Sequence, residues 1–69
     1  MKYAVVYEKG ESSYGAYVPD LPGCVAVADS LDEVKALIQE AIEFHLEGLR
    51  IDDLDIPEPT SECDYVTVV

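Results

Sequence analysis

The sequence predicts an α+β domain in the order β-β-β-α-β, with an antiparallel sheet and one helix packed on one of its faces. Two apolar segments separated by a short turn indicate a hairpin, and a third apolar segment follows a turn rich in proline. A segment with helical periodicity and a strong helix start comes next. At 69 residues the chain is expected to form a single domain over residues 1–69.

The first two strands are predicted over Lys2–Glu8 and Tyr14–Val18, because both segments are rich in β-branched and aromatic residues. The segment Lys9–Ser12 supplies the turn between them, and so short a connection predicts an antiparallel pair. Within the second strand, Gly15 is a candidate β-bulge.

A turn over Pro19–Gly23 leads to a third strand at Cys24–Ala28. Proline cannot donate a backbone hydrogen bond inside a sheet, and Gly23 supplies the freedom that a tight turn needs. Asp20 has two interpretations: it contacts a basic side chain of a partner, or it forms an Asx turn with nearby backbone amides. Leu21 is expected to contact a partner if its side chain is exposed at the turn tip.

The helix is predicted to begin after Ser30, a strong N-cap, and to end near Gly48. Glu33 lies three residues after Ser30 and completes a capping box. Apolar residues at helical spacing are expected to face the core, namely Val34, Leu37, Ile38, Ala41, Ile42, His45 and Leu49. The opposite side carries Glu40, Glu43 and Glu47, which form either a solvated face or a docking surface for a basic partner.

The segment Arg50–Glu62 is predicted to be an acidic, partly extended connector with Ile56 as an anchor. A last strand is predicted over Asp64–Val69. Because the strands are apolar on both faces and one helix covers only one of them, we expect a homo-oligomer, either a dimer or a tetramer. Its interface is expected to contain Tyr65, Val66, Thr67, Val68 and Val69.

The net charge of −11 arises from fifteen acidic and four basic residues. Such a surface repels the phosphates of nucleic acids and anionic membranes, so direct binding to either is not expected. It attracts basic proteins instead, although high charge also serves solubility. No apolar run approaches the length of a membrane span, and two cysteines make no disulfide framework. These features predict a cytoplasmic protein with reduced thiols.

Polar side chains of the sequence could in principle serve a metal-dependent nuclease, a histidine base or ligand, or a zinc site. Asp20, Asp29, Glu40 and Asp64 are carboxylates of the kind that hold Mg²⁺ in nucleases, but the chain lacks the positive charge that holds a polyanionic substrate. His45 lies within the apolar stripe and is expected to be a buried or interface histidine rather than a base or ligand. The spacing of Cys24, His45 and Cys63 matches no zinc motif. We therefore expect no enzymatic activity, no metal and no cofactor.

Two segments together resemble the HicB-like antitoxins of type II toxin–antitoxin systems. The first is Tyr17-Val18-Pro19-Asp20-Leu21-Pro22-Gly23-Cys24, and the second is Asp29-Ser30-Leu31-Asp32-Glu33. The helix residues Glu40-Ala41-Ile42 and the tail Ile56-Pro57-Glu58-Pro59 are also similar to the family. The resemblance extends over nearly the whole chain.

The resemblance implies a truncated RNase H-like fold and a non-enzymatic protein that neutralises a small basic toxin of the HicA type, an mRNA-cleaving ribonuclease. Ala28 stands where many members carry glycine. Many members also continue into a C-terminal DNA-binding domain. The residues that resemble the family here do not include such a domain, so operator binding is not expected. The alternatives are a stand-alone acidic oligomeric module without a toxin partner and, less favoured, a metal-dependent nuclease.

Overall fold

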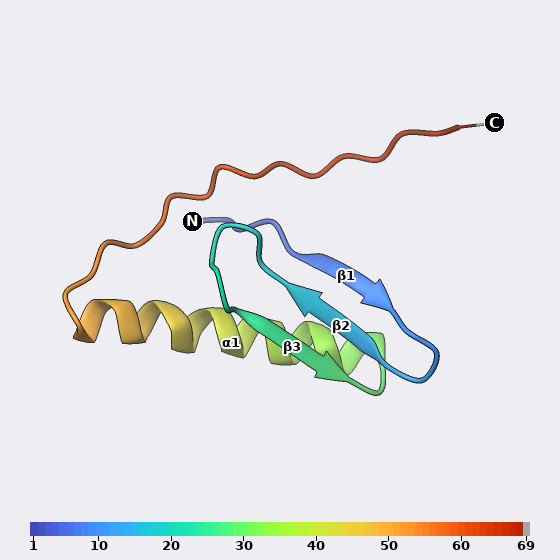
Figure 1. Cartoon of the computed structure of the whole chain (residues 1–69), viewed down its shortest axis with the longest axis horizontal. Helices are drawn as coiled ribbons and strands as arrows, with labels where there is room; N and C mark the ends of the chain where they lie inside the picture. The colour runs from blue at the N-terminus through green and yellow to red at the C-terminus, as the bar shows by residue number, and fades with distance from the viewer. Residues whose placement is uncertain (69) are drawn as a thin grey trace.

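In the computed structural model, which describes residues 1–68, three antiparallel strands are followed by one long helix (Figure 1). The strands are β1 (Val6–Lys9), β2 (Tyr14–Tyr17) and β3 (Val25–Ala28), and the helix α1 spans Leu31–Ile51. The sheet order is β1-β2-β3, so β1 and β3 are its two edges. The predicted α+β class is therefore confirmed, with each strand shorter than the sequence suggested.

The hairpin of β1 and β2 has an uninterrupted register, with Val6 opposite Tyr17 and Lys9 opposite Tyr14. Gly15 pairs regularly with Glu8 on one side and with Val27 on the other. The bulge expected at Gly15 is therefore absent. The register continues into β3 and places neighbouring side chains of all three strands on common faces.

The Pro19–Gly23 segment folds as two consecutive turns. The Leu21 amide donates to the Val18 carbonyl at 3.1 Å, and the Cys24 amide donates to the Leu21 carbonyl at 3.0 Å. A proline occupies the second position of each turn, where its fixed φ is favourable. Gly23 has a φ of 84°, which completes the second turn as type II. The double turn reverses the chain and directs Leu21 inward.

The helix begins and ends at recognisable caps. Ser30 is the N-cap, and its hydroxyl accepts a hydrogen bond from the Glu33 amide at 3.2 Å, as predicted. At the other end, Asp53 adopts the left-handed conformation with a φ of 55°. The Leu54 amide donates to the Leu49 carbonyl at 2.8 Å, which makes this end a Schellman motif. The helix thus ends at Ile51, slightly later than expected.

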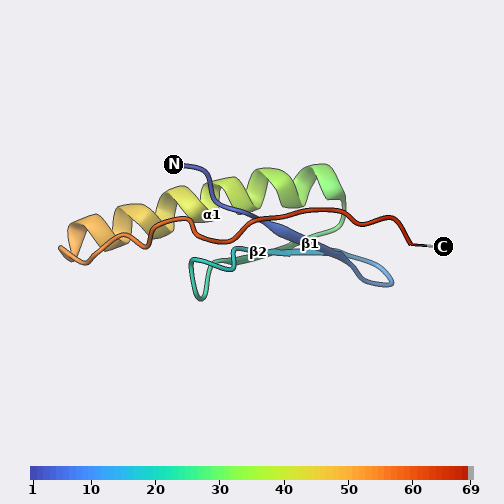
Figure 2. The same cartoon turned by 90° about the horizontal axis from the view of Figure 1, so that it is seen from above.

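The core lies between α1 and one face of the sheet, and Figure 2 shows the helix on that side only. Six side chains are buried there: Ala16, Val18, Leu21, Cys24, Val34 and Ile38. The predicted stripe is correct for most positions. Leu37, however, is 42% exposed, and Leu46 packs against the core in its stead. The opposite sheet face, with Tyr17, Val25 and Val27, is uncovered.

After α1 the chain runs as an extended C-terminal arm, residues 54–68, back along the body (Figure 1). The Tyr3 hydroxyl holds it by donating to the Pro57 carbonyl at 2.6 Å. The expected last strand is not formed by residues 64–68, because no described strand pairs with them. The radius of gyration is 13.4 Å, whereas a compact chain of this length has about 11 Å. The chain is therefore more extended than a compact domain of its length.

Candidate functional site

The exposed side of α1 carries two parallel rows of side chains. Leu37, Phe44 and Ile51 recur every seven residues and are exposed, Phe44 to 83%. Glu33, Glu40 and Glu47 follow the same seven-residue spacing and are also exposed. Because seven residues make nearly two helical turns, each set forms a row along the axis. The result is an apolar row bordered by carboxylates.

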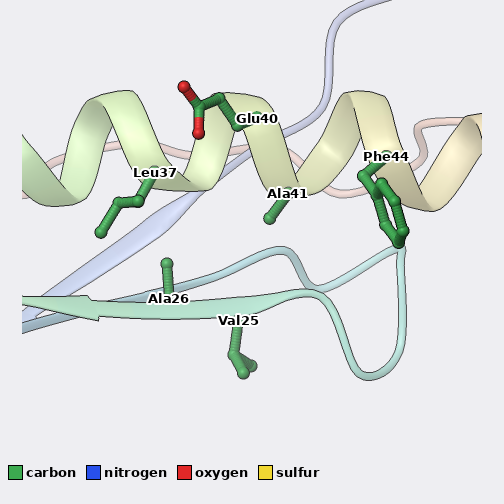
Figure 3. A pocket seen from close by; sticks show the side chains of 6 residues that line it. All are labelled: Val25, Ala26, Leu37, Glu40, Ala41 and Phe44. Carbon is green, nitrogen blue, oxygen red and sulfur yellow. The ribbon is translucent and has the colours of Figure 1, made fainter.

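The apolar row continues into a groove between α1 and the edge strand β3, called here the β3–α1 groove. Its volume is about 420 Å³, and its lining is Val25, Ala26, Leu37, Glu40, Ala41 and Phe44. Figure 3 shows Ala26, Leu37 and Ala41 turned toward one another, while the carboxylate of Glu40 points away from the strand. The groove has an apolar floor and an acidic rim, beside a strand edge whose backbone groups are unpaired.

Negative charge dominates this surface. Glu40, Glu43 and Glu47 lie three or four residues apart on α1 and are all exposed. Glu47 forms an exposed ion pair with Arg50, with 3.7 Å between the Glu47 carboxylate and the Arg50 guanidinium. An exposed pair of this kind offsets little of the repulsion among the remaining carboxylates. The surface is therefore suited to positively charged groups of another molecule.

The family model for HicB-like antitoxins of bacterial toxin–antitoxin systems matches residues 3–67, nearly the whole chain. The chain belongs to the HicB-like antitoxin family. The resemblance identified from the double-proline turn and the capped helix is thereby confirmed. No solved structure gave a significant match.

Three relatives place this HicB-like chain among proteins of phage, archaeal and bacterial origin. It is 38% identical over 66 residues to a 14.9 kDa protein from the rep-hol intergenic region of Haemophilus phage HP1, covering 96% of this chain and 50% of the relative. It is 52% identical to a UPF0150 protein of Archaeoglobus fulgidus over 48 residues, which are 68% of this chain and 70% of the relative. A UPF0150 protein of Helicobacter pylori is 47% identical over 49 residues, 71% of this chain and 68% of the relative. The chain thus spans half the length of the phage relative.

The expectation that Leu21 contacts a partner from the turn tip is wrong for this conformation. Its side chain is 0% exposed and forms part of the core with Val18, Val34 and Ile38. The two turns fold the tip of the loop back under the sheet, a geometry that residue types alone do not reveal. Leu21 is a core residue supplied by a loop.

Asp20 accepts hydrogen bonds from residues of its own chain. Its carboxylate accepts hydrogen bonds from the backbone amides of Thr60 and Ser61 at 3.0 and 2.9 Å. The two hydroxyls also donate to it, at 3.2 Å from Thr60 and 2.8 Å from Ser61. The bonds from Ser61, followed by those from Thr60, lower the pKa of Asp20 below its ordinary value. Asp20 therefore fastens the arm to the loop, through partners forty residues away rather than through the Asx turn considered above.

The side chains considered for chemistry remain dispersed. Within residues 1–68, no group of three or more His, Cys, Asp or Glu side chains lies close enough to hold a metal ion. His45 is half-buried on α1, Cys63 is exposed on the arm, and burial raises the pKa of the Cys24 thiol. Among the described residues, no helix is long and apolar enough to cross a membrane.

The residues expected at an oligomer interface lie together at the end of the arm. Tyr65, Val66 and Val68 are among the most exposed large apolar side chains described, and Thr67 is exposed with them. Val69, the remaining residue of that set, lies outside the described residues.

Phe44, Ile51 and Val25 border or continue the β3–α1 groove but are not among the site residues predicted from the sequence. The seven-residue spacing of Leu37, Phe44 and Ile51 was a signal in the sequence that could have indicated an exposed apolar row. Val25 could not have been found in this way, because its exposure depends on the sheet face opposite α1 being uncovered.

Proposed function

We propose that this chain is a non-enzymatic antitoxin that binds and neutralises a small basic toxin of the HicA type in the cytoplasm. The observation that carries the proposal is the β3–α1 groove, in which an apolar floor lies beside a row of glutamates on a chain with a net charge of −11. An apolar centre with a charged rim is the usual composition of a protein–protein interface.

Inhibition follows from the chemistry of the proposed target. A ribonuclease that cleaves mRNA needs positive side chains to hold the phosphates of its substrate. Glu40, Glu43 and Glu47 present carboxylates to those same side chains, so a bound antitoxin competes with RNA for them. The complementary charges also accelerate the encounter of the two proteins. Phe44, 83% exposed beside the groove, supplies an aromatic anchor of the kind that dominates binding energy.

Co-expression with a small basic protein encoded beside this chain tests the proposal. The two proteins are expected to co-purify, and expression of this chain is expected to relieve the growth arrest that the basic protein causes. If the neighbour arrests growth and this chain neither binds it nor relieves the arrest, the proposal fails. A gene context without a small basic neighbour favours the stand-alone acidic module instead.

Matched variants locate the binding surface. Glu40→Lys on α1 and Glu11→Lys on the first hairpin reverse the same charge at exposed positions, so they change net charge equally. We expect Glu40→Lys to weaken binding about tenfold or more and Glu11→Lys to have little effect. Phe44→Ala is expected to weaken binding about thirtyfold, and Val27→Ala on the uncovered sheet face serves as its control. Equal losses for Glu40→Lys and Glu11→Lys would show that overall charge, not the groove, determines binding.

A further inference from the structure

The sheet has an unpaired edge at β1, and a segment suited to pair with it lies alongside. Residues 62–65 of the arm line a groove with Val5, Val6 and Tyr7, called here the β1–arm groove, with a volume of about 370 Å³. Within the described chain, no backbone hydrogen bond joins residues 62–68 to β1. The arm therefore lies beside the edge strand β1 but does not pair with it as a further strand of the sheet.

The end of the arm has the composition of a strand and the exposure of an unpaired one. Tyr65 is 97%, Val66 81% and Val68 84% exposed, which leaves a row of β-prone apolar side chains in solvent. Five extended residues, 64–68, span about 17 Å, and the four residues of β1 span about 13 Å. The end of the arm is long enough to cover the whole edge.

Charge favours contact between an arm and a β1 edge. Three of the four basic residues lie in the N-terminal segment or face it, since Lys2 precedes β1, Lys9 ends it, and the Lys35 amine lies 6.0 Å from the Tyr7 ring centroid. The chain from residue 52 to residue 64 carries the opposite charge, with Asp52, Asp53, Asp55, Glu58, Glu62 and Asp64. Two copies of this acidic protein therefore repel each other least where the arm of one copy contacts β1 of the other.

The path of a chain's own arm directs its end away from its own edge. Tyr3 holds Pro57, and Asp20 holds Thr60 and Ser61, so the arm is fixed up to residue 61. Beyond these anchors Figure 1 shows the arm diverging from β1 toward its end. Residues 66–68 therefore lie beyond the part of the arm that lines the β1–arm groove, and a second molecule can reach them.

We propose that residues 64–68 of one copy pair as a strand with β1 of a second copy, and that the reciprocal exchange forms a two-fold symmetric dimer. The unpaired edge of β1 and the extended residues 64–68 of each chain then gain main-chain partners, and the apolar side chains of both arms leave water. Within residues 1–68, six hydrophobic residues are buried, and this assembly adds further buried surface to so small a core. The β3–α1 groove stays free, so the dimer does not depend on the proposed toxin binding.

Sedimentation velocity of the full chain over a range of concentrations measures the proposed dimer directly. We expect wild type to sediment at twice the 7.6 kDa chain mass. Val66→Asp is expected to raise the dimer Kd about tenfold or more, because each dimer contains two copies of the substitution. Phe44→Asp, also at an exposed apolar residue but in the β3–α1 groove, is expected to leave the mass unchanged. Circular dichroism should show both variants folded, since neither side chain lies in the core.

The dependence of mass on concentration distinguishes exchange from pairing within one chain, because an arm that pairs with β1 of its own chain leaves the protein at 7.6 kDa. A cysteine at residue 6 would not make this distinction, since Val6 and Cys63 line one groove of the same chain. A wild type that is monomeric at every concentration, or a Val66→Asp mass equal to that of wild type, overturns the exchange.

Discussion

Leu21→Ala is expected to remove a large part of the stability of the domain, although residue 21 lies in a loop. The Leu21 side chain is 0% exposed, so truncation loses its full transfer free energy, about 2.4 kcal/mol for the carbons removed. The cavity left among Val18, Val34 and Ile38 adds to this, because neighbouring side chains relax only partly. A total of about 3–4 kcal/mol is expected, within the range of buried leucine truncations.

That loss is large for a domain of this size. A 69-residue domain has a free energy of unfolding of about 3–10 kcal/mol, so the variant is expected to be marginally folded. Its Tm should fall by about 12–32 °C, given about 4–8 °C per kcal/mol. Urea unfolding followed by far-UV circular dichroism measures the change. Leu54→Ala, which truncates the same side chain at a 57% exposed position, should cost less than about 0.5 kcal/mol.

The outcome separates a core role from a surface role for the turn. If Leu21→Ala unfolds at the same urea concentration as Leu54→Ala, then Leu21 does not anchor the core and the inference from burial is refuted. If the stability of Leu21→Ala is unchanged while its binding to the basic partner weakens, then Leu21 contacts the partner, as the sequence suggested.

Three further predictions concern the turn, the arm and the two thiols. The pKa of Asp20 is lower in the folded chain than in an unfolded one. The stability that its ionised carboxylate contributes is therefore present above the ordinary pKa of about 3.9, and it is lost as the pH falls through the lowered pKa. Limited proteolysis should therefore detect release of the arm as the pH falls through the lowered pKa of Asp20, and Asp20→Asn should show easier cleavage of the arm already at neutral pH. Gly23→Ala should destabilise the fold by about 1–2 kcal/mol in urea unfolding, although its Cβ meets no atom within 4 Å, because a φ of 84° is strained for alanine; an unchanged midpoint would contradict this reasoning. Cys63 is exposed, whereas burial raises the pKa of Cys24, so a thiol reagent at pH 7 should label Cys63 promptly and Cys24 only at the rate of unfolding. Rapid labelling of both cysteines would show that the core around Cys24 opens readily.

Local signals explain why the helix and the hairpin could be predicted from the sequence. Ser30 and Glu33 determine the start of α1 through contacts within one turn, and proline and glycine mark the reversal between β2 and β3. These features depend on neighbours in sequence, so they can be recognised without knowledge of the fold. The family resemblance rests on the same residues.

Other features depend on residues that are distant in sequence. Asp20 could not be assigned its role in advance, because its hydrogen-bond donors are forty residues away. Leu21 looked like a turn-tip residue, and only the double turn directs it inward. The strand expected at Asp64–Val69 has a suitable composition, but strand formation also requires a paired edge, which residues 64–68 lack in the single chain. The acidic face of α1 was correctly located, whereas the neighbouring groove depends on where the β3 edge lies.

The burial of Leu21 also determines where this chain tolerates a change of length. In many domains a short connection between strands accepts insertions, because its residues contact only solvent. Here an insertion within Pro19–Gly23 shifts a core side chain out of place and moves Asp20 away from the arm that it fastens. The connection between β1 and β2, around the exposed Gly10, bears no such constraint. Inserted tags and the length variation of relatives should therefore concentrate at the first hairpin and be excluded from the second connection.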